Sequence, residues 1–258
     1  MYLWTFLRAS ARQFLSFVFC LFLVACGGGG GSDGAETVES TAPAVSNPVP
    51  QDVSANGLWS GTFTETGLGT FDVAGIFYDG RLIAISESAN AIYDGSYTMD
   101  GETISAAVTG FEIFGGPFVT TAMTGNTQEA SNISLSFSTS YGSNGTISLD
   151  YDATYDQPSS LEAVSDVWLF TDGGYSITLV VDDDGEYVGS ASDGCLYSGR
   201  IGLLDPNKNL YDVSTSIENC GVRNGDYTGL TTLLNNQDVL YTTVSNDDFI
   251  FLYGFIRQ

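Results

Sequence analysis

Residues 131–138, SNISLSFS, alternate polar and apolar side chains without a break. Ile133, Leu135 and Phe137 fall on one face of an extended chain, and polar residues fall on the other. This period of two is that of a β-strand with one face buried and one face in water. Residues 175–181, YSITLVV, show the same alternation, so the pattern predicts an all-β chain.

Turn signals divide the rest of the chain into many short segments of this kind. The dipeptides that favour tight hairpin turns are Asp79-Gly80, Asp100-Gly101, Asn144-Gly145 and Asp184-Gly185. Only residues 159–166, SSLEAVSD, predict a short helical turn, with a serine cap before it. Strands are expected to begin near Leu58, Thr70, Arg81, Ala91, Glu102, Pro117, Ser131 and Asn144, then near Asp166, Gly174, Glu186, Cys195, Leu210, Asp226, Asp238 and Phe249.

The two sets of eight strands carry the same landmarks in the same order. These landmarks are Trp59 and Trp168, Asp79-Gly80 and Asp184-Gly185, then Tyr93-Asp94-Gly95 and Tyr197-Ser198-Gly199. The repeat predicts two tandem eight-stranded antiparallel up-and-down β-barrels, because closure removes the two edges of each sheet. A β-sandwich is the alternative closure. The expected units are a barrel at 57–157, a short helical connector at 158–165 and a second barrel at 166–258.

The N-terminus has the layout of a bacterial export signal. Arg8 and Arg12 precede the apolar segment 14–24, which is too short to span a membrane as a helix. Leu23-Val24-Ala25-Cys26 resembles the lipobox of bacterial lipoproteins, which implies removal of residues 1–25 and attachment of lipid, palmitate included, to Cys26. Lipoproteins kept at the inner membrane often have aspartate after the cysteine, so with Gly27 at that position the resemblance implies the outer membrane. A plain secretory signal with an incidental cysteine is the alternative.

Residues 26–56 are rich in glycine, serine and proline and contain no aromatic residue, so they are expected to form a flexible tether. The tether ends at GLWSG, residues 57–61, which resembles the opening strand of lipocalin and avidin-type barrels, a calycin-like architecture. YDATYDQPSSL (151–161), DGCLYSG (193–199) and NLYDVSTSIENC (209–220) are similar to a group of uncharacterised bacterial outer-membrane lipoproteins. That resemblance implies a location at the outer membrane and implies no activity.

The charge of the chain restricts its partners. Without residues 1–25 the chain has 31 acidic residues against 5 basic ones, a formal charge of −26. Nucleic acid is excluded as an expected partner, because its binding requires cationic side chains along the phosphates. A cationic protein would be attracted by this charge, and so would metal cations. The alternative is that the charge only confers solubility.

Histidine is absent from the chain, which excludes triads and metal sites that depend on imidazole. A hydrolase that uses two carboxylates on a glycan stays open, although no acidic pair is marked. The acidic turn formed by Asp182, Asp183, Asp184 and Glu186 is a candidate for calcium. Because aspartate is also an ordinary turn residue, we expect a turn here, with no metal and no cofactor. The same holds for residues 205–209, DPNKN.

Cys195 and Cys220 are expected to form a disulfide. Folding the hairpin between them symmetrically around DPNKN pairs Leu204 with Tyr211 and places the two cysteines opposite each other. Export provides an oxidising compartment for the bond, and two buried free thiols are the alternative. The last strand, FIFLYGFIR at 249–257, is apolar on both faces, so one face should fill its barrel and the other should meet the first barrel.

These observations predict a non-catalytic, lipid-anchored outer-membrane protein with a binding or structural role. The ligand would be a small molecule or a cationic protein. The alternatives are an inhibitor or receptor for a cationic protein, in the manner of lysozyme-inhibitor lipoproteins or surface receptors, and a carboxylate-based glycan hydrolase. The likeness to those two lipoprotein classes is one of general plan only.

Overall fold

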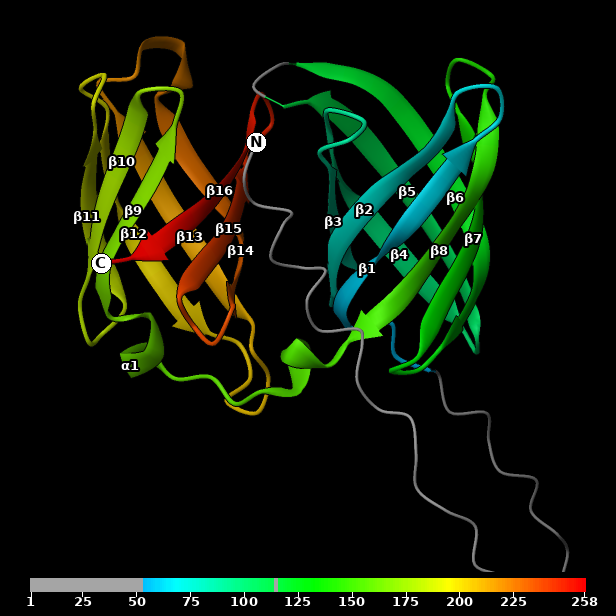
Figure 1. The fold of residues 1–258 in the computed structure, drawn as a ribbon, viewed down its shortest axis with the longest axis horizontal. Helices are drawn as coiled ribbons and strands as arrows, with labels where there is room; N and C mark the ends of the chain where they lie inside the picture. Colours follow the sequence, from blue (N-terminus) through cyan, green and yellow to red (C-terminus); the bar gives the residue numbers. More distant parts are fainter. Residues whose placement is uncertain (1–52, 114–115) are drawn as a thin grey trace, which may run out of the picture. The chain divides into compact units, whose positions relative to one another are not determined.

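The computed structural model describes residues 53–113 and 116–258, and it contains two closed antiparallel β-barrels of eight strands each (Figure 1). The first barrel consists of β1 (Gly57–Glu65), β2 (Gly69–Tyr78), β3 (Arg81–Ser86), β4 (Ala91–Asp100), β5 (Thr103–Glu112), β6 (Pro117–Gln128), β7 (Asn132–Thr139) and β8 (Asn144–Asp152). The second consists of β9 (Asp166–Asp172), β10 (Tyr175–Val181), β11 (Glu186–Ala191), β12 (Leu196–Leu203), β13 (Tyr211–Glu218), β14 (Gly225–Leu234), β15 (Val239–Ser245) and β16 (Ile250–Arg257).

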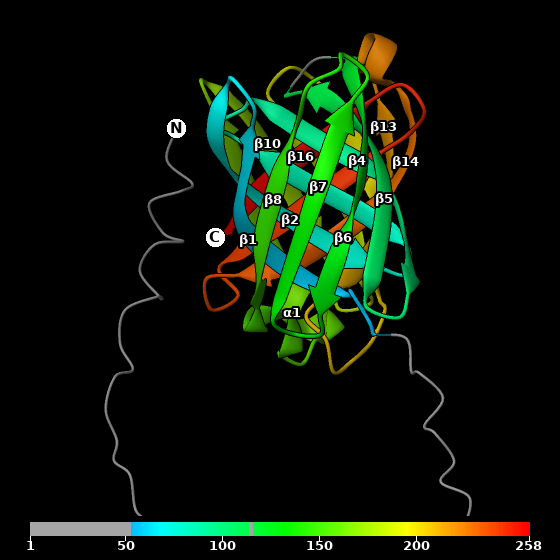
Figure 2. The same cartoon turned by 90° about the vertical axis from the view of Figure 1, so that its right-hand side faces the viewer.

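Each strand pairs with its neighbours in the sequence, and the first strand of each barrel pairs with the last. Figure 2 shows the closing pair β1 and β8 side by side. The predicted fold of two up-and-down barrels is therefore confirmed, and every strand begins within one residue of its expected start. The signal sequence, Cys26 and the tether as far as residue 52 lie outside the described residues.

The connector between the barrels contains the predicted helical turn, α1 (Leu161–Val164). The Ser160 side chain caps it by accepting a hydrogen bond from the Ala163 amide at 3.1 Å. Two 3₁₀ turns that the sequence did not indicate, η1 (Ala153–Asp156) and η2 (Gly221–Arg223), follow β8 and β13. No helix in the described part of the chain is long and apolar enough to cross a membrane.

The strand register confirms the internal repeat. Trp59 on β1 lies opposite Gly75 on β2, and Trp168 on β9 lies opposite Leu179 on β10. Following the register across two further strands leads from these pairs to Tyr93 on β4 and to Tyr197 on β12. In both barrels the tryptophan indole donates to the carbonyl oxygen four residues earlier, at 3.0 Å and 2.8 Å.

The first of these carbonyls belongs to Ala55, in the segment that the sequence assigned to the tether. Ala55 is buried in the core of the first barrel. The side-chain oxygen of Asn56 accepts hydrogen bonds from the Asp79 amide at 3.0 Å and from the Tyr97 hydroxyl at 2.6 Å. Residues 53–56 are therefore part of the barrel, because one apolar contact and three hydrogen bonds fix them there.

Cys195 and Cys220 form the expected disulfide, with their Cα atoms 4.9 Å apart. The register by which we expected them to meet is wrong by one residue, since Tyr211 lies opposite Leu203 and not Leu204. The ladder ends at Glu218, and Asn219 then takes a left-handed conformation with φ of 58°. This turn of the backbone brings Cys220 back to Cys195.

The two faces of β16 have the predicted environments. Phe251, Tyr253 and Phe255 lie in the core of the second barrel. Ile250, on the other face, lies in a small buried cluster with Ile85 and Ile92 of the first barrel. Beside this cluster, Ser245 of β15 donates to Asp94 at 2.7 Å and accepts from Arg81 at 3.0 Å.

Candidate functional site

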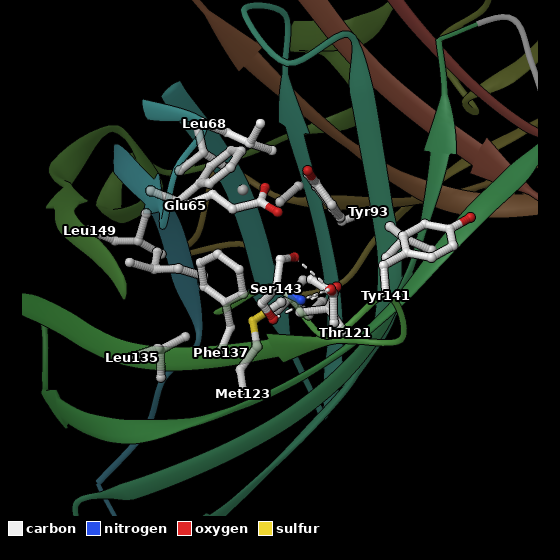
Figure 3. A pocket seen from close by; sticks show the side chains of 18 of the residues that line it. Glu65, Leu68, Tyr93, Thr121, Met123, Leu135, Phe137, Tyr141, Ser143 and Leu149 are labelled. Carbon is white, nitrogen blue, oxygen red and sulfur yellow. Dashed lines mark hydrogen bonds between the residues drawn. The ribbon is translucent and has the colours of Figure 1, made fainter. Parts of the chain in front are cut away.

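The interior of the first barrel contains a cavity of about 240 Å³ that opens at one end of the barrel (Figure 3). Most of the side chains that line it are apolar. They include Phe63, Leu68, Val73, Phe77, Leu82, Ala84, Phe118, Val119, Met123, Leu135, Phe137, Ile147 and Leu149. Such an enclosed, mainly apolar space with few polar groups is the usual form of a small-molecule site.

The strand ends and turns at one end of the barrel form the mouth of the cavity. Leu68 lies in the turn between β1 and β2, and Tyr141 lies in the turn between β7 and β8. Both side chains are largely exposed, at 69% and 75%. The Tyr141 hydroxyl donates to the carbonyl oxygen of Phe118 at the start of the neighbouring strand β6. At the other end, Trp59 and Tyr97 are packed in the core and close the barrel.

The cavity exists because several inward positions of the first barrel carry small or aliphatic residues. The strand register identifies the corresponding positions in the second barrel, where the residues are larger. Gly75 corresponds to Leu179. The pair Arg257–Trp168 corresponds to Tyr151–Trp59, so steps of two and four residues back along β16 and β8 match Phe255 with Leu149 and Tyr253 with Ile147. In the second barrel Phe251, Tyr253 and Phe255 form a continuous row of rings along β16, with centroids 5.5 to 6.1 Å apart.

Two polar groups at the open end of the cavity, those of Glu65 and Tyr93, have no hydrogen-bond or ion-pair partner among the described residues. The carboxylate of Glu65 points into the cavity on the side of Tyr93 (Figure 3). Neither this carboxylate nor the Tyr93 hydroxyl has a hydrogen bond or ion pair to another described residue. Burial, together with the charge of Glu65, raises the pKa of Tyr93 to about 12, so its hydroxyl stays protonated at neutral pH.

Two further polar residues of the cavity satisfy each other. Thr139 and Ser143, on either side of the β7–β8 turn, have their hydroxyl oxygens 2.6 Å apart. The amide of Ser143 also donates to the Thr139 hydroxyl oxygen. These two residues stabilise the turn, whereas Glu65, Tyr93 and Thr121 are the lining residues whose side chains are available to a ligand.

The acidic residues that the sequence singled out have structural roles in a turn. Asp182 accepts hydrogen bonds from the amides of Asp184 and Glu186 at 3.0 and 2.9 Å, as in an Asx turn. Asp183 accepts from the Ser165 hydroxyl at 2.7 Å. Glu186 lies 3.7 Å from Arg200. In residues 53–113 and 116–258, no three histidine, cysteine or acidic side chains are placed to hold a metal ion.

The DPNKN turn is structural as well. Asn209 is buried, and its side chain donates to the carbonyl oxygen of Leu233 at 2.6 Å and accepts from the Leu233 amide at 3.1 Å. Asp205 accepts from the backbone and side chain of Asn207. The side chains of this turn are therefore engaged with the protein itself.

Our sequence interpretation did not identify Glu65 or Tyr93 as site residues. A signal was present, since Trp59, Gly61, Phe63 and Glu65 alternate along β1 and share its inner face. Glu65 is half-buried, and a charged residue on the otherwise apolar inner face of a strand is a sign of a site, because removing a charge from water without a partner is costly. What the alternation could not show is that the space in front of Glu65 is empty.

No protein-family model, curated protein or solved structure matches this chain.

Proposed function

We propose that this protein is a non-catalytic, lipid-anchored protein of the outer membrane whose first barrel binds a small apolar ligand. The apolar cavity of about 240 Å³ is the observation that carries the proposal. An apolar cavity of about 150 Å³ takes up benzene, so at the same ratio this one holds roughly nine or ten non-hydrogen atoms. Only one of the lining residues, Glu65, is acidic, whereas a carboxylate-based glycan hydrolase needs two acids across its substrate.

Calorimetric titration with octanol tests the binding role, because octanol has nine non-hydrogen atoms and no charge. We expect one saturable site in the wild type. The variant Ile147→Phe, which introduces a ring into the cavity, should lose at least about tenfold in affinity. Val188→Phe adds the same ring at an exposed position of the second barrel and should bind as the wild type does. Equal affinity of all three proteins would contradict binding in the cavity.

The proposed anchor at Cys26 is supported by the lipobox-like residues before it and by the Cys195–Cys220 bond, since disulfides are typical of exported proteins. Metabolic labelling with a palmitate analogue should tag the wild-type protein in the outer-membrane fraction. The Cys26→Ala variant should carry no label. Equal labelling of the two proteins would exclude this cysteine as the lipid site.

The charge of the chain favours a second candidate function, the binding of a cationic protein. The part of the chain that the structure describes contains five basic side chains, and each is within 4 Å of an acid: Arg81, Arg200, Lys208, Arg223 and Arg257. The unpaired surface charge is therefore negative. Association with a cationic protein such as lysozyme should weaken steeply with ionic strength. Salt-independent association, or none, would exclude this function.

A further inference from the structure

We infer that the ligand of the first barrel is an amphipathic cation, with an apolar body in the cavity and a protonated amine at Glu65. This inference rests on the proposed function, because it names the chemical class of the ligand for the same cavity. Three features of the site support it: the position of the carboxylate, the absence of a protein cation beside it, and the aromatic rings around it.

Glu65 is the last residue of β1, and the register makes its side chain the outermost inward-facing group of that strand. Gly145 lies directly opposite it on β8. A Cβ atom at Gly145 would lie 2.0 Å from the Thr64 carbonyl oxygen and 2.6 Å from the Phe137 ring, so this position is restricted to glycine and the ring packs beside it. The Glu65 carboxylate lies at the open end of the cavity with Leu68 and Tyr141, at the depth where the head of a bound ligand would lie.

The protein supplies no described cation for this carboxylate. The five basic side chains of residues 53–113 and 116–258 are paired with other acids, and four of them belong to β12 or later segments. Arg81, the one in the first barrel, begins β3 at the end of the barrel opposite Glu65 and contacts Asp94 and Ser245. A negative charge in a mainly apolar cavity without a counter-ion favours a positive ligand.

Aromatic rings surround the same region of the cavity. Phe63 packs edge-on against Tyr93 and Phe137, each with ring centroids 6.2 Å from its own, and stacks on Phe71 at 5.0 Å. The electron-rich faces of such rings attract alkylammonium groups, and the attraction is greatest where water is excluded. The raised pKa of Tyr93 agrees with this environment, since both burial and the negative charge of Glu65 contribute to it.

A matched series of octyl probes distinguishes this inference from the proposed function. Octylamine and octanol share an octyl chain, octanoate has a chain one methylene shorter next to its carboxylate, and the three heads differ in charge at neutral pH. We expect octylamine to bind at least about tenfold more tightly than octanol, and octanoate to bind more weakly than octanol. Equal affinities for octylamine and octanol would overturn the cationic ligand and leave the apolar site standing. Failure of all three probes to bind would overturn the proposed function as well.

Substitution of Glu65 identifies the group that recognises the charge. In Glu65→Gln the preference for octylamine over octanol should fall to about threefold or less, with octanol affinity unchanged. Glu129→Gln, in the exposed turn between β6 and β7 at the opposite end of the barrel, removes the same charge and should keep the full preference. Thermal unfolding of both variants serves as the folding control. A full preference in Glu65→Gln would contradict the assignment.

Discussion

The two barrels share strand number, topology and the position of a buried tryptophan, yet the first encloses an apolar cavity and the second has a core rich in aromatic rings. The first barrel has Gly75, Ile147 and Leu149 on its inner face, and a cavity of about 240 Å³ lies between them. The second has Leu179 at the position of Gly75 and the rings of Phe251, Tyr253 and Phe255 along β16. A few inward side chains therefore distinguish the interiors of the two barrels.

Comparison of the two barrels separates glycines that both barrels require for close packing of strands from a glycine that only the first barrel has. Gly95 and Gly199 occupy the same position in both barrels, and a Cβ atom at either would lie 2.0 Å from a carbonyl oxygen of the next strand. These glycines are needed for the close approach of two backbones, whatever the interior holds. Gly75 has no glycine counterpart in the second barrel, and its absent side chain contributes to the cavity.

The barrels are also closed differently. Eight residue pairs join β1 to β8, whereas only Ile256–Leu169 and Arg257–Trp168 join β16 to β9. The second barrel compensates for its short seam with the Cys195–Cys220 bond and with Arg257, whose guanidinium lies 4.5 Å from the Trp168 ring centroid. The first barrel thus has the longer closing pair of strands. The second barrel has a shorter closing pair, together with the disulfide and the contact of Arg257 with Trp168.

The largest expected effect comes from hollowing the second barrel. Tyr253 is buried and packs edge-on against Phe170 at 5.2 Å. Because truncation of a buried ring leaves a cavity, Tyr253→Ala should lower the free energy of unfolding by about 3–5 kcal/mol. Urea denaturation measures this loss, and Tyr141→Ala, an exposed control, should stay within about 0.5 kcal/mol. A loss below about 1 kcal/mol would mean that the second barrel is not tightly packed.

Removal of the disulfide should affect only the second barrel. The bond closes a loop with a sequence separation of 25, for which chain entropy gives about 3.5 kcal/mol. Hydrogen exchange of the Cys195→Ala/Cys220→Ala double variant should therefore be faster in β9–β16 and unchanged in β1–β8. Uniformly faster exchange in both barrels would show that they unfold as one cooperative unit.

Loss of Arg257 should weaken the short seam of the second barrel. Its guanidinium donates to Asp166 and to the carbonyl oxygen of Ala163, each at 2.7 Å. Arg257→Met keeps part of the apolar stem of the side chain and removes these hydrogen bonds. We therefore expect the free energy of unfolding, measured by urea denaturation, to fall by about 1–3 kcal/mol. Arg200→Met, at an exposed pair 3.7 Å apart, is the control and should cost less than about 1 kcal/mol. Equal losses would show that the seam does not depend on Arg257.

The smallest effect concerns the carboxylate that Arg257 binds. The hydrogen bond from Arg257 lowers the pKa of Asp166 below its ordinary value of 3.8. The ionised group therefore stabilises the fold above that value, and this contribution disappears as the pH falls through the lowered pKa. At neutral pH the free energy of unfolding of the wild type should exceed that of Asp166→Asn by up to about 1 kcal/mol, because the ion pair is partly exposed. The two free energies should converge in acid. Thermal unfolding across pH 2–7 measures the difference, and a constant difference would contradict the linkage.

The sequence is sufficient to predict which side chains of β1 face the interior of the barrel. It is not sufficient to predict that a cavity lies in front of them. Alternation along β1 assigns Glu65 to the inner face together with Trp59 and Phe63. The acidic turn at Asp182 was the candidate metal site in the sequence because its carboxylates are adjacent along the chain. In the structure, Asp182 and Asp183 accept hydrogen bonds from backbone amides and from the Ser165 hydroxyl. Adjacency in sequence is a poor guide to a site when turns themselves require aspartate.

The sequence by itself determined the class, number and starts of the strands and the pairing of Cys195 with Cys220. Alternation and turn dipeptides are local properties, so strands and turns can be predicted from them without knowledge of the rest of the chain. Tertiary structure decided the one-residue shift between Leu203 and Tyr211, the packing of Ala55 and the cavity. A cavity is the difference between the space that eight strands enclose and the volume of side chains from all of them. That difference depends on which residues the register places at one level of the barrel, and they come from strands as distant in sequence as β1 and β8.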